Sequence, residues 1–444
     1  MPTIEVVDDN EEEQEQEFKT LEELLATFEP GLKVPKDFSD PDWAVGNNAA
    51  TLISWRNRAS ESIKKLYKAV ESSEPFVVDQ LYVPLVAAVV SFTGSRDWVK
   101  AEARESAQAI MSHVGPPTLA QIRAVLLNIV KPAFEKARPN ESLNLNTATK
   151  MKRGINADLA YHDEADSVWK HDLRLVDIVS WCLTSLQDND WESIWPLIIP
   201  PVLTYMDDWE AAQRLFGVAL TRQLVARAPS SLLTRTGIDQ LIRTSLGTSL
   251  LRFGDPLSPI LFKQAAMASM ELAGKTAKVG SPEYYQLLFS LVGENIIGGA
   301  WTFGYREPLL IQATYEILPQ ILENLGVACV RYLKALVPQL LHTLVPLEGA
   351  RPSVELQKAS LRALKDVIHF GAPRISYWSG EIVGGIAKFW VLQEDKQVND
   401  PVITSLLVAV LRELSSACPD VTQARLEVLN TLDPRFSRLI SSIA

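Results

Sequence analysis

Residues 195–227, with the sequence WPLIIPPVLTYMDDWEAAQRLFGVALTRQLVAR, constrain the fold more than any other part of this chain. The pattern predicts one helix that ends at Tyr205, a break at Asp207-Asp208, and a second helix that begins at Trp209. Apolar residues recur along one face of the second helix, at Ala212, Phe216, Ala219 and Leu220. Two amphipathic helices joined by so short a break form a helical hairpin, whose apolar faces need a neighbouring element to cover them.

Three residues of this segment stand at a characteristic spacing, since Pro200 precedes Asp208 by eight residues and Asp208 precedes Arg214 by six. The spacing resembles the HEAT repeat, a helical hairpin with a proline in its first helix, an aspartate in its turn and an arginine early in its second helix. Such hairpins stack into solenoids. The sequence therefore predicts an all-α protein, an α-solenoid of HEAT/armadillo-like helical hairpins. Because the full signature occurs once, the expected repeats are degenerate.

Helical periodicity extends over most of the chain, and the separators between the expected helices use the same residue types. Proline is tolerated in the first turn of a helix, and an adjacent Asp or Ser can cap it. The separators are Gly-Asp-Pro at 254–256, Gly-Ser-Pro at 280–282, Arg-Glu-Pro at 306–308, Arg-Pro-Ser at 351–353 and Asn-Asp-Pro at 399–401. The helices expected in the second half lie at about 256–276, 282–298, 307–325, 328–347, 353–370, 378–392, 402–417 and 424–444.

Apolar stripes are clear in two of these helices, and strands should be scarce because alternating patterns are almost absent. One stripe contains Leu333, Leu336, Val337, Leu340, Leu341 and Leu344, and another contains Leu361, Leu364 and Ile368. Asp-Trp pairs recur at 42–43, 97–98, 190–191 and 208–209, where we expect a capping aspartate and a tryptophan packed over the first turn. At roughly 40 residues per hairpin, the chain has room for about nine hairpins.

The charge is unevenly distributed and divides the chain. The formal net charge is 43 − 54 = −11, and residues 1–17 carry eight acidic residues without a Lys or Arg. The remainder is therefore close to neutral, at 43 − 46 = −3. We expect an acidic disordered tail at 1–17, which either only solvates the protein or docks on a basic partner. An N-terminal helical region at 18–137, a polar loop at 138–160 and a HEAT-like helical-repeat region at 161–444 follow.

Catalytic and metal-binding patterns are weak throughout. Asp163-Glu164-Ala165-Asp166 spells a helicase box, but no phosphate-binding loop precedes it. His162 and His171 are nine residues apart, which does not place them on one helix face as a zinc helix requires. Neither GxSxG nor GxGxxG occurs. Cys182, Cys329 and Cys418 stand in apolar helical contexts without CxxC spacing. We therefore expect no catalytic residues, no metal and no cofactor.

The sequence also predicts where in the cell the protein resides and two kinds of partner that it does not contact. The N-terminus is acidic and lacks an apolar signal core, and the longest apolar run, residues 81–92, contains Pro84 and is too short to span a bilayer. We expect a protein of the cytoplasm and nucleus that contacts no membrane. The chain after residue 17 is close to neutral and lacks the stripe of Lys and Arg side chains that contacts with phosphate groups need. We therefore expect no direct binding of nucleic acid.

Four segments carry a resemblance to a known family. They are WPLIIPPVLTYMDD at 195–208, AAQRLFGVAL at 211–220, EPLLIQATYEILPQIL at 307–322 and RYLKALVPQLLHTLVP at 331–346. They resemble the Tel-two-interacting protein two family, a subunit of the TTT (Triple T) complex, and the resemblance covers about residues 165–415. It implies a non-catalytic partner of two larger helical-repeat subunits. It further implies work with the ninety-kilodalton heat-shock chaperone and its R-two-TP adaptor on newly made phosphatidylinositol-3-kinase-related kinases. Telomere maintenance and DNA-damage signalling would follow indirectly from the abundance of those kinases.

Two alternatives stay open at this level. Another HEAT-type adaptor, such as a transport carrier that binds a small GTPase or a phosphatase scaffold that binds a catalytic subunit, would show the same helical pattern. An enzyme would require the fold to organise one of the weak clusters, and loss of bound metal when His162 and His171 are both replaced would reveal it.

The C-terminal third is the expected partner face, because aromatic residues dominate interface energetics. The candidate contact residues are Trp378, Phe389 and Trp390, close to the apolar segment 402–411. The competing interpretation is that these aromatic side chains belong to the core, as buried tryptophans commonly do.

Overall fold

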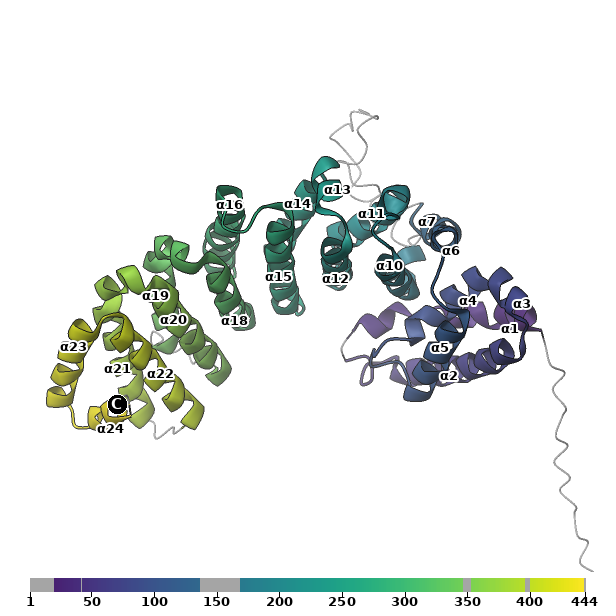
Figure 1. Cartoon of the computed structure of the whole chain (residues 1–444). Helices are drawn as coiled ribbons and strands as arrows, with labels where there is room; N and C mark the ends of the chain where they lie inside the picture. The colour runs from purple at the N-terminus through teal and green to yellow at the C-terminus, as the bar shows by residue number, and fades with distance from the viewer. Residues whose placement is uncertain (1–19, 41, 136–167, 346–352, 396–399, 443–444) are drawn as a thin grey trace, which may run out of the picture. The chain divides into compact units, whose positions relative to one another are not determined.

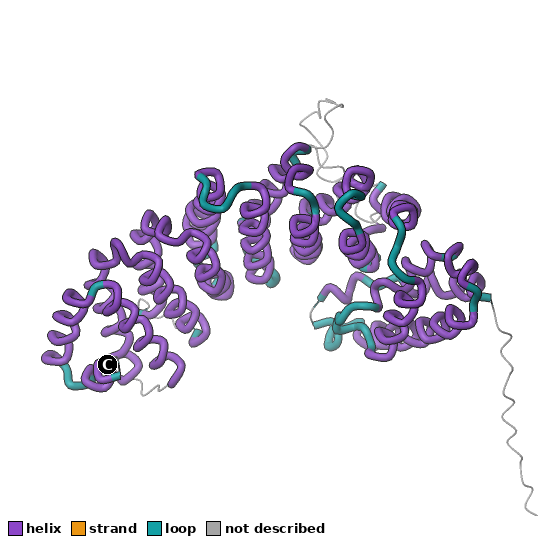
Figure 2. Tube along the Cα trace, in the orientation of Figure 1, coloured by secondary structure: helices purple, strands orange, loops and turns teal. Residues whose placement is uncertain are grey.

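The computed structural model describes residues 20–40, 42–135, 168–345, 353–395 and 400–442. Within these ranges the regular structure is helical, and the β pairing consists of an isolated antiparallel bridge between Pro35 and Asp172. Figure 2 shows helices throughout the described chain, connected by short loops. The all-α expectation is confirmed. The acidic tail at 1–17 and the polar loop at 138–160 lie outside the described residues.

The described chain divides into two compact units. Unit 1 contains residues 20–135 and 168–185, and unit 2 contains residues 186–442. The sequence placed residues 161–185 in the repeat region, whereas the structure packs 168–185 with the N-terminal helices. The reason is a set of contacts from this segment back to the N-terminal region, including an ion pair of 2.5 Å between Arg96 and Asp177.

Unit 1 is built from short helices around one longer one. Its first half contains α1 (Leu21–Phe28), η1 (Glu29–Leu32), η2 (Lys36–Ser39), α2 (Ala49–Ser72), α3 (Pro75–Gln80), α4 (Tyr82–Val89) and η3 (Val90–Phe92). Its second half contains α5 (Ala101–Val114), α6 (Leu119–Val125), the π-helix η4 (Leu126–Val130), α7 (Lys131–Phe134), α9 (Val168–His171) and α10 (Arg174–Ser185). Rings of Phe38, Trp55, Phe92 and Trp98 pack with centroid distances of 5.3–6.2 Å.

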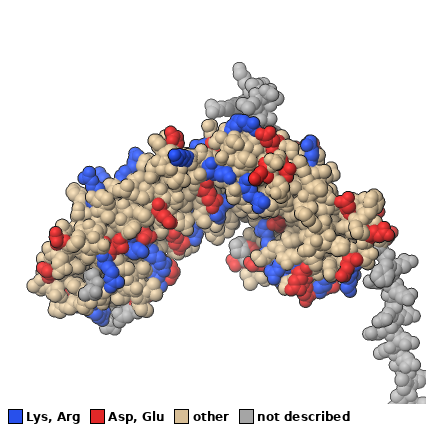
Figure 3. Space-filling model, in the orientation of Figure 1, with Lys and Arg blue, Asp and Glu red and all other residues tan. Residues whose placement is uncertain are grey.

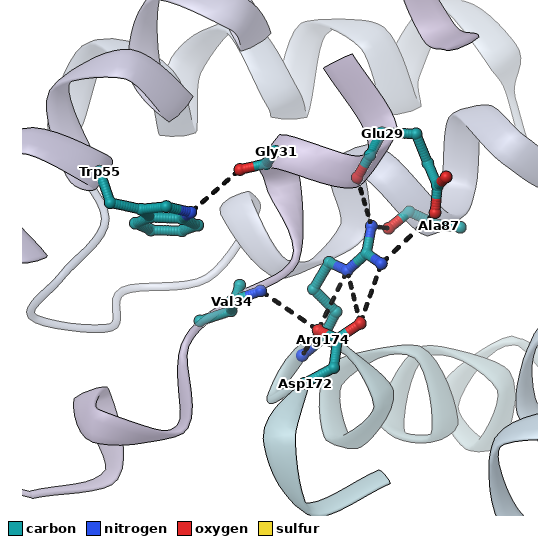
Figure 4. Close-up of polar contacts among 7 residues, drawn as sticks. All are labelled: Glu29, Gly31, Val34, Trp55, Ala87, Asp172 and Arg174. Carbon is teal, nitrogen blue, oxygen red and sulfur yellow. Dashed lines mark hydrogen bonds and ion pairs between the residues drawn. The ribbon is translucent and has the colours of Figure 1, made fainter. Parts of the chain in front are cut away.

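A buried ion pair at the start of α10 holds unit 1 together (Figure 4). Arg174 and Asp172 are 4% and 6% exposed, and Nη2 of Arg174 lies 2.9 Å from Oδ2 of Asp172. The guanidinium also donates to the carbonyl oxygens of Glu29, at 3.4 Å, and Ala87, at 3.5 Å. Oδ1 of Asp172 accepts a hydrogen bond of 3.2 Å from the amide of Val34. The pair therefore ties α10 to α4 and to the chain around η1.

Unit 2 is a series of helical hairpins. Its first part contains α11 (Trp191–Asp207), α12 (Ala211–Arg227), α13 (Ser230–Arg235), α14 (Ile238–Leu250), α15 (Ser258–Thr276), α16 (Pro282–Ser290), the π-helix η7 (Leu291–Ala300) and α17 (Trp301–Phe303). Then come α18 (Pro308–Leu325), η8 (Gly326–Tyr332), α19 (Leu333–Leu344), α20 (Val354–Ile375), η9 (Ser376–Trp378), α21 (Ser379–Asp395), α22 (Pro401–Ala417), α23 (Pro419–Leu432) and α24 (Phe436–Ser441).

These hairpins stack in two layers. In one layer α12, α15, α18, α20 and α22 each pack beside the next, as Figure 1 shows. In the other layer α11 packs on α14, α14 on η7, α19 on α21, and α21 on α23. Because each hairpin buries its apolar face against its neighbours, the core runs continuously along the unit. Unit 2 is therefore a solenoid of degenerate hairpins, as expected.

The predicted separators mark helix starts in unit 2. α16, α18 and α22 begin at Pro282, Pro308 and Pro401. The hydroxyl of Ser353 accepts a hydrogen bond of 3.1 Å from the amide of Leu356 and so caps α20. The expected leucine stripes of α19 and α20 are buried as well. These features are local, which explains why the sequence predicted them.

Three local expectations were wrong. The helix expected at 282–298 changes at Leu291 into a π-helix that continues to Ala300. The last expected helix, 424–444, instead begins at Pro419, ends at Leu432 and is followed by α24. Among the Asp-Trp pairs, Trp98 and Trp191 are buried, but Trp209 is 56% exposed.

The packing of α11 against α12 is closer than the sequence indicated. A Cβ atom added at Gly217 would lie 2.4 Å from the backbone nitrogen of Met206, so the two backbones touch at this point. The expected stripe of α12 is partly wrong, because Leu220 is buried while Ala219 is exposed. The reason is that α12 packs against both α11 and α15, which buries a broader surface centred on Gly217.

Candidate protein-interaction surface

The repeat-signature residues lie at the turn between α11 and α12. Pro200 is an exposed residue inside α11, and Asp208 ends that helix in an extended conformation. Oδ1 of Asp208 accepts a hydrogen bond of 2.8 Å from the amide of Glu210. Nε of Arg214 donates to the carbonyl oxygen of Asp208 at 2.5 Å. Asp208 and Arg214 are thus in contact, whereas Pro200 takes no part in these contacts.

Arg214 also reaches the next hairpin. Its Nη1 donates to the hydroxyls of Thr248, at 2.9 Å, and Ser249, at 3.2 Å, both on α14. Burial lowers the pKa of the Arg214 guanidinium, and the positive charge of Arg252 adds to this effect. The Arg214 side chain therefore hydrogen-bonds in the turn of its own hairpin and also binds the following hairpin. Its role is to hold neighbouring hairpins together.

Side-chain pairs join neighbouring helices of the layer formed by α12, α15, α18, α20 and α22. One pair links α12 to α15, one links α15 to α18, and two link α20 to α22. We call these four pairs the ladder. Three are ion pairs, Arg222–Glu271 at 2.6 Å, Lys263–Glu316 at 2.7 Å and Lys358–Asp400 at 3.1 Å, and the fourth is a hydrogen bond of 2.8 Å between Nδ1 of His369 and a carboxylate oxygen of Glu413. Pairs at or near the surface contribute about 0–1 kcal/mol each, so the ladder adds little to the stability of unit 2.

Asp400 has two roles in this ladder, and its removal gives a pH-dependent prediction. Its carboxylate caps α22 by accepting hydrogen bonds from the amides of Val402 and Ile403, at 2.8 and 3.3 Å. The hydrogen bond from Lys358 and these amides lower its pKa below the ordinary value of 3.8. The stabilisation is therefore complete above that ordinary value and is lost as the pH falls through the lower folded-state pKa.

We expect Asp400→Ala to lower the urea midpoint of unfolding at pH 7, and the difference from the wild-type protein to shrink at pH 3. Asp400→Asn should lie between the two at pH 7, because asparagine still caps a helix but carries no charge. Urea titrations at both pH values measure this. A difference that is equal at pH 7 and pH 3 would contradict the assigned role of the charge.

The surface of the described chain carries charges of both signs. On the face shown in Figure 3, Lys and Arg side chains are interspersed with Asp and Glu, without a continuous stripe of one sign. Such a mixed surface suits protein partners better than a polyanion.

The aromatic residues expected to contact a partner lie mostly in the core. Phe389 is 0% exposed and Trp390 is 3% exposed, so neither side chain is on the surface of the described structure. Nε1 of Trp390 donates to the carbonyl oxygen of Arg435 at 3.1 Å, and the guanidinium of Arg438 lies 5.2 Å from its ring centroid. Trp378 is half-buried. Phe389 and Trp390 are therefore core residues, as the competing interpretation states, because α23 and α24 cover this part of α21.

Several exposed apolar residues were missed by sequence reasoning. Tyr377, next to the predicted Trp378, is 85% exposed. Val428 and Leu432 on α23 are 57% and 74% exposed. Phe303, at the end of α17, and Tyr305, in the turn after it, are 71% and 59% exposed. The spacing of residues 421, 425, 428 and 432 is a helical stripe, so the signal was present, but a stripe alone does not reveal which face is covered.

A groove of about 940 Å³ lies elsewhere in unit 2, with a wall made by Phe289 and Tyr332. The guanidinium of Arg331 lies 4.6 Å from the ring centroid of Phe289 and 5.6 Å from that of Tyr332. The hydroxyl of Tyr332 donates to the carbonyl oxygen of Phe289 at 2.9 Å. The groove thus has an ordered wall of a stacked cation and aromatic rings, and its lining also includes Ser290, whose hydroxyl donates to Glu294 at 2.7 Å.

The weak candidate patterns of the sequence are only partly within the described residues. His162 and the helicase-box residues Asp163 to Asp166 lie outside them, and His171 is exposed. Within the part of the chain that the structure describes, no three His, Cys, Asp or Glu side chains come together as a metal site would require.

The three cysteine thiols are buried and unpaired. Burial raises the pKa of the Cys182 thiol, and it raises the pKa of the Cys329 thiol to about 11. Both thiols are therefore protonated at neutral pH and behave as small apolar side chains. Among the described helices, none is both long and apolar enough to cross a membrane.

Stacked helical hairpins, ladder contacts between neighbours and exposed apolar residues define a helical-repeat protein of the α-solenoid class. Residues 85–348, more than half of the chain, match the sequence model of the Tti2 family. The chain belongs to the Tti2 family, and this membership implies work within a protein complex. Among solved structures, the crystal structure of an engineered protein matches with 13% identity and a TM-score of 0.33, covering 96% of this chain and 98% of that one.

Proposed function

We propose that this chain is a non-catalytic scaffold subunit of the TTT (Triple T) complex. In this role it binds two larger helical-repeat subunits in the cytoplasm and nucleus. The observation that carries the proposal is the family match over residues 85–348. The stacked hairpins support it, because a solenoid presents a long surface to other proteins.

The complex would assist the folding and assembly of phosphatidylinositol-3-kinase-related kinases, together with the ninety-kilodalton heat-shock chaperone and its R-two-TP adaptor. Telomere maintenance and DNA-damage signalling would then depend on this chain through kinase abundance. The buried thiols fit a structural role, since they stay protonated at neutral pH.

A native pull-down of the tagged full-length protein at low and at high salt tests the proposal. We expect mass spectrometry to identify two larger helical-repeat partners at both salt concentrations, with chaperone and kinases in smaller amounts. Recovery of a small GTPase or a phosphatase catalytic subunit in their place would favour a transport carrier or a phosphatase scaffold.

Depletion of the protein in cells tests the proposed role in the folding and assembly of the kinases. We expect the protein levels of the related kinases to fall while their messenger RNA stays constant, because the defect lies in maturation. Restoring the wild-type chain should restore kinase protein. Unchanged kinase levels after complete depletion would contradict the proposed role.

A further inference from the structure

The turn between α14 and α15 and the turn between α17 and α18 are fastened to each other. The amide of Gly254 in the first turn donates a hydrogen bond of 2.9 Å to Oε1 of Glu307 in the second. Leu251, at the end of α14, lies against the end of the π-helix η7, because a Cβ atom added at Gly299 would meet Cδ2 of Leu251 at 2.5 Å. The two turns therefore hold their side chains in fixed positions relative to each other.

Large apolar side chains are exposed together on these two turns. Phe303, Tyr305 and Leu309 are 71%, 59% and 67% exposed, and Leu251 is 46% exposed. Elsewhere in the described chain, large apolar side chains that are more than half exposed stand singly or in pairs. Adjoining exposed apolar residues mark interaction sites. We define the paired-turn patch as Leu251, Arg252, Phe303, Tyr305, Arg306 and Leu309.

The two arginines of the paired-turn patch have no carboxylate partner among the described residues. Nε of Arg252 is buried and has no hydrogen-bond acceptor in the described structure. The guanidinium of Arg306 lies 5.3 Å from the ring centroid of Tyr305, and its Nε donates to the Tyr305 hydroxyl at 2.9 Å. These contacts leave the positive charge of both guanidinium groups without a negative counterpart.

The carboxylates of the same two turns are already engaged. Oδ1 of Asp255 accepts a hydrogen bond of 2.9 Å from the amide of Leu257, and Glu307 accepts the amide of Gly254. Both acidic residues are half-buried. The charge that the patch offers to a partner is therefore positive, and an anionic partner complements it.

The charges and the apolar side chains together decide between occupants. A second copy of this chain, docked through the same patch in a two-fold dimer, would bring the arginines of both copies together, and like charges across an interface are unfavourable. A nucleic acid needs a row of cations, whereas the patch offers two beside the aliphatic Leu251 and Leu309. A protein segment with both carboxylates and apolar side chains meets both requirements.

We propose that the paired-turn patch binds an acidic, amphipathic segment of a partner protein. Apolar side chains of that segment pack on the aromatic and aliphatic residues of the patch, and its carboxylates pair with Arg252 and Arg306. Tyrosine and arginine are residue types that anchor interfaces. Because the two turns are fastened together before binding, little order has to be created on association. The inference is independent of the proposed function, since it is drawn from the side chains of the patch alone.

Photo-crosslinking of the tagged full-length chain in cells identifies the occupant. The probe is the photo-reactive amino acid p-benzoylphenylalanine, placed at position 303 or, as the matched control, at position 279. Val279 is 68% exposed on the turn between α15 and α16, outside the patch. We expect position 303 to form a product whose joined peptide, sequenced by mass spectrometry, carries acidic and apolar side chains. Position 279 should not form this product.

A synthetic peptide with the sequence of the crosslinked segment then allows a dissociation constant to be measured. Arg306→Glu and Leu309→Asp should each weaken binding about tenfold or more. Arg306→Lys should retain part of the binding, since lysine keeps the charge but not the planar guanidinium. Arg227→Glu, at the exposed end of α12, is the charge-reversal control and should bind as the wild-type chain does. Equal melting temperatures of all variants would show that the folds are intact.

The outcomes separate this surface from the proposed function. An acidic, apolar segment crosslinked at position 303 supports the surface whether or not its protein is a TTT subunit, so the two proposals can fail separately. A basic segment, the absence of a product at position 303, or peptide binding unchanged by Arg306→Glu would overturn the inference. A crosslink between two copies of this chain, or a product that nuclease removes, would also overturn it, because the occupant would then be a second copy or a nucleic acid.

Discussion

Gly217→Ala is expected to destabilise unit 2 by about 3 kcal/mol or more, although it adds a single methyl group. The new Cβ atom would lie 2.4 Å from the backbone nitrogen and 2.7 Å from Cα of Met206 on α11. Backbone atoms cannot swing away as a flexible side chain can, so α11 and α12 would have to separate. Because that hairpin is the first of unit 2, its neighbours would lose packing with it.

Gly247→Ala is the matched control for this prediction. Gly247 lies inside α14, and a Cβ atom there would meet nothing within 4 Å. Alanine favours a helix interior over glycine by about 0.5–1 kcal/mol, so this variant should be neutral or slightly more stable. Thermal unfolding followed by circular dichroism compares the two. Equal melting temperatures for the two variants would show that α11 and α12 do not touch at Gly217.

Arg174→Met is expected to destabilise unit 1 by about 3–5 kcal/mol, because it leaves the charge of Asp172 buried without its partner. Methionine fills part of the same volume, so the main loss is the charge and its hydrogen bonds. The contacts to the carbonyl oxygens of Glu29 and Ala87 would be lost as well. We expect loosening of η1 and of the start of α10, which hydrogen–deuterium exchange would detect.

Two comparisons isolate the buried charge. The double variant Asp172→Asn, Arg174→Met should recover part of the loss, since the uncompensated carboxylate is gone. Arg235→Met removes an ion pair with Glu192 whose side chains are 65% and 73% exposed, and it should cost about 1 kcal/mol or less. If Arg174→Met and Arg235→Met cost the same, the buried pair does not hold unit 1 together.

These variants also sharpen the functional test. The Gly217 and Arg174 variants should reduce binding to partners only through loss of folded protein. The melting temperature measures that loss, so it distinguishes a folding defect from a binding defect.

Much of the helical pattern could be predicted because its signals are local. Proline at positions 282, 308 and 401 begins a helix in the structure, as the missing N–H and fixed φ of proline favour. The π-helix at 291–300 could not be predicted, because it depends on close packing. A Cβ atom at Gly299 would lie 2.5 Å from Cδ2 of Leu251, a residue far away in the sequence.

The candidate contact residues show the limit of the same reasoning. Phe389 and Trp390 have the composition of an interface, yet α23 and α24 cover this part of α21 and bury both side chains. Val428 and Leu432 have an ordinary helical spacing, yet no described helix follows α23 in its layer and they remain exposed. The residue composition of a helix face indicates what it can bind, but the packing of neighbouring helices decides whether that face is exposed.

The sequence by itself determined the helical hairpins and their proline-led starts, since each depends on residues within one or two turns of chain. Only the tertiary structure decided that residues 168–185 pack with the N-terminal helices and that Asp172 and Arg174 are buried together. It also decided that Val428 and Leu432 on α23 are exposed in the described structure. The physical reason is that burial belongs to pairs of distant surfaces, and a one-dimensional pattern marks an apolar face without specifying its partner.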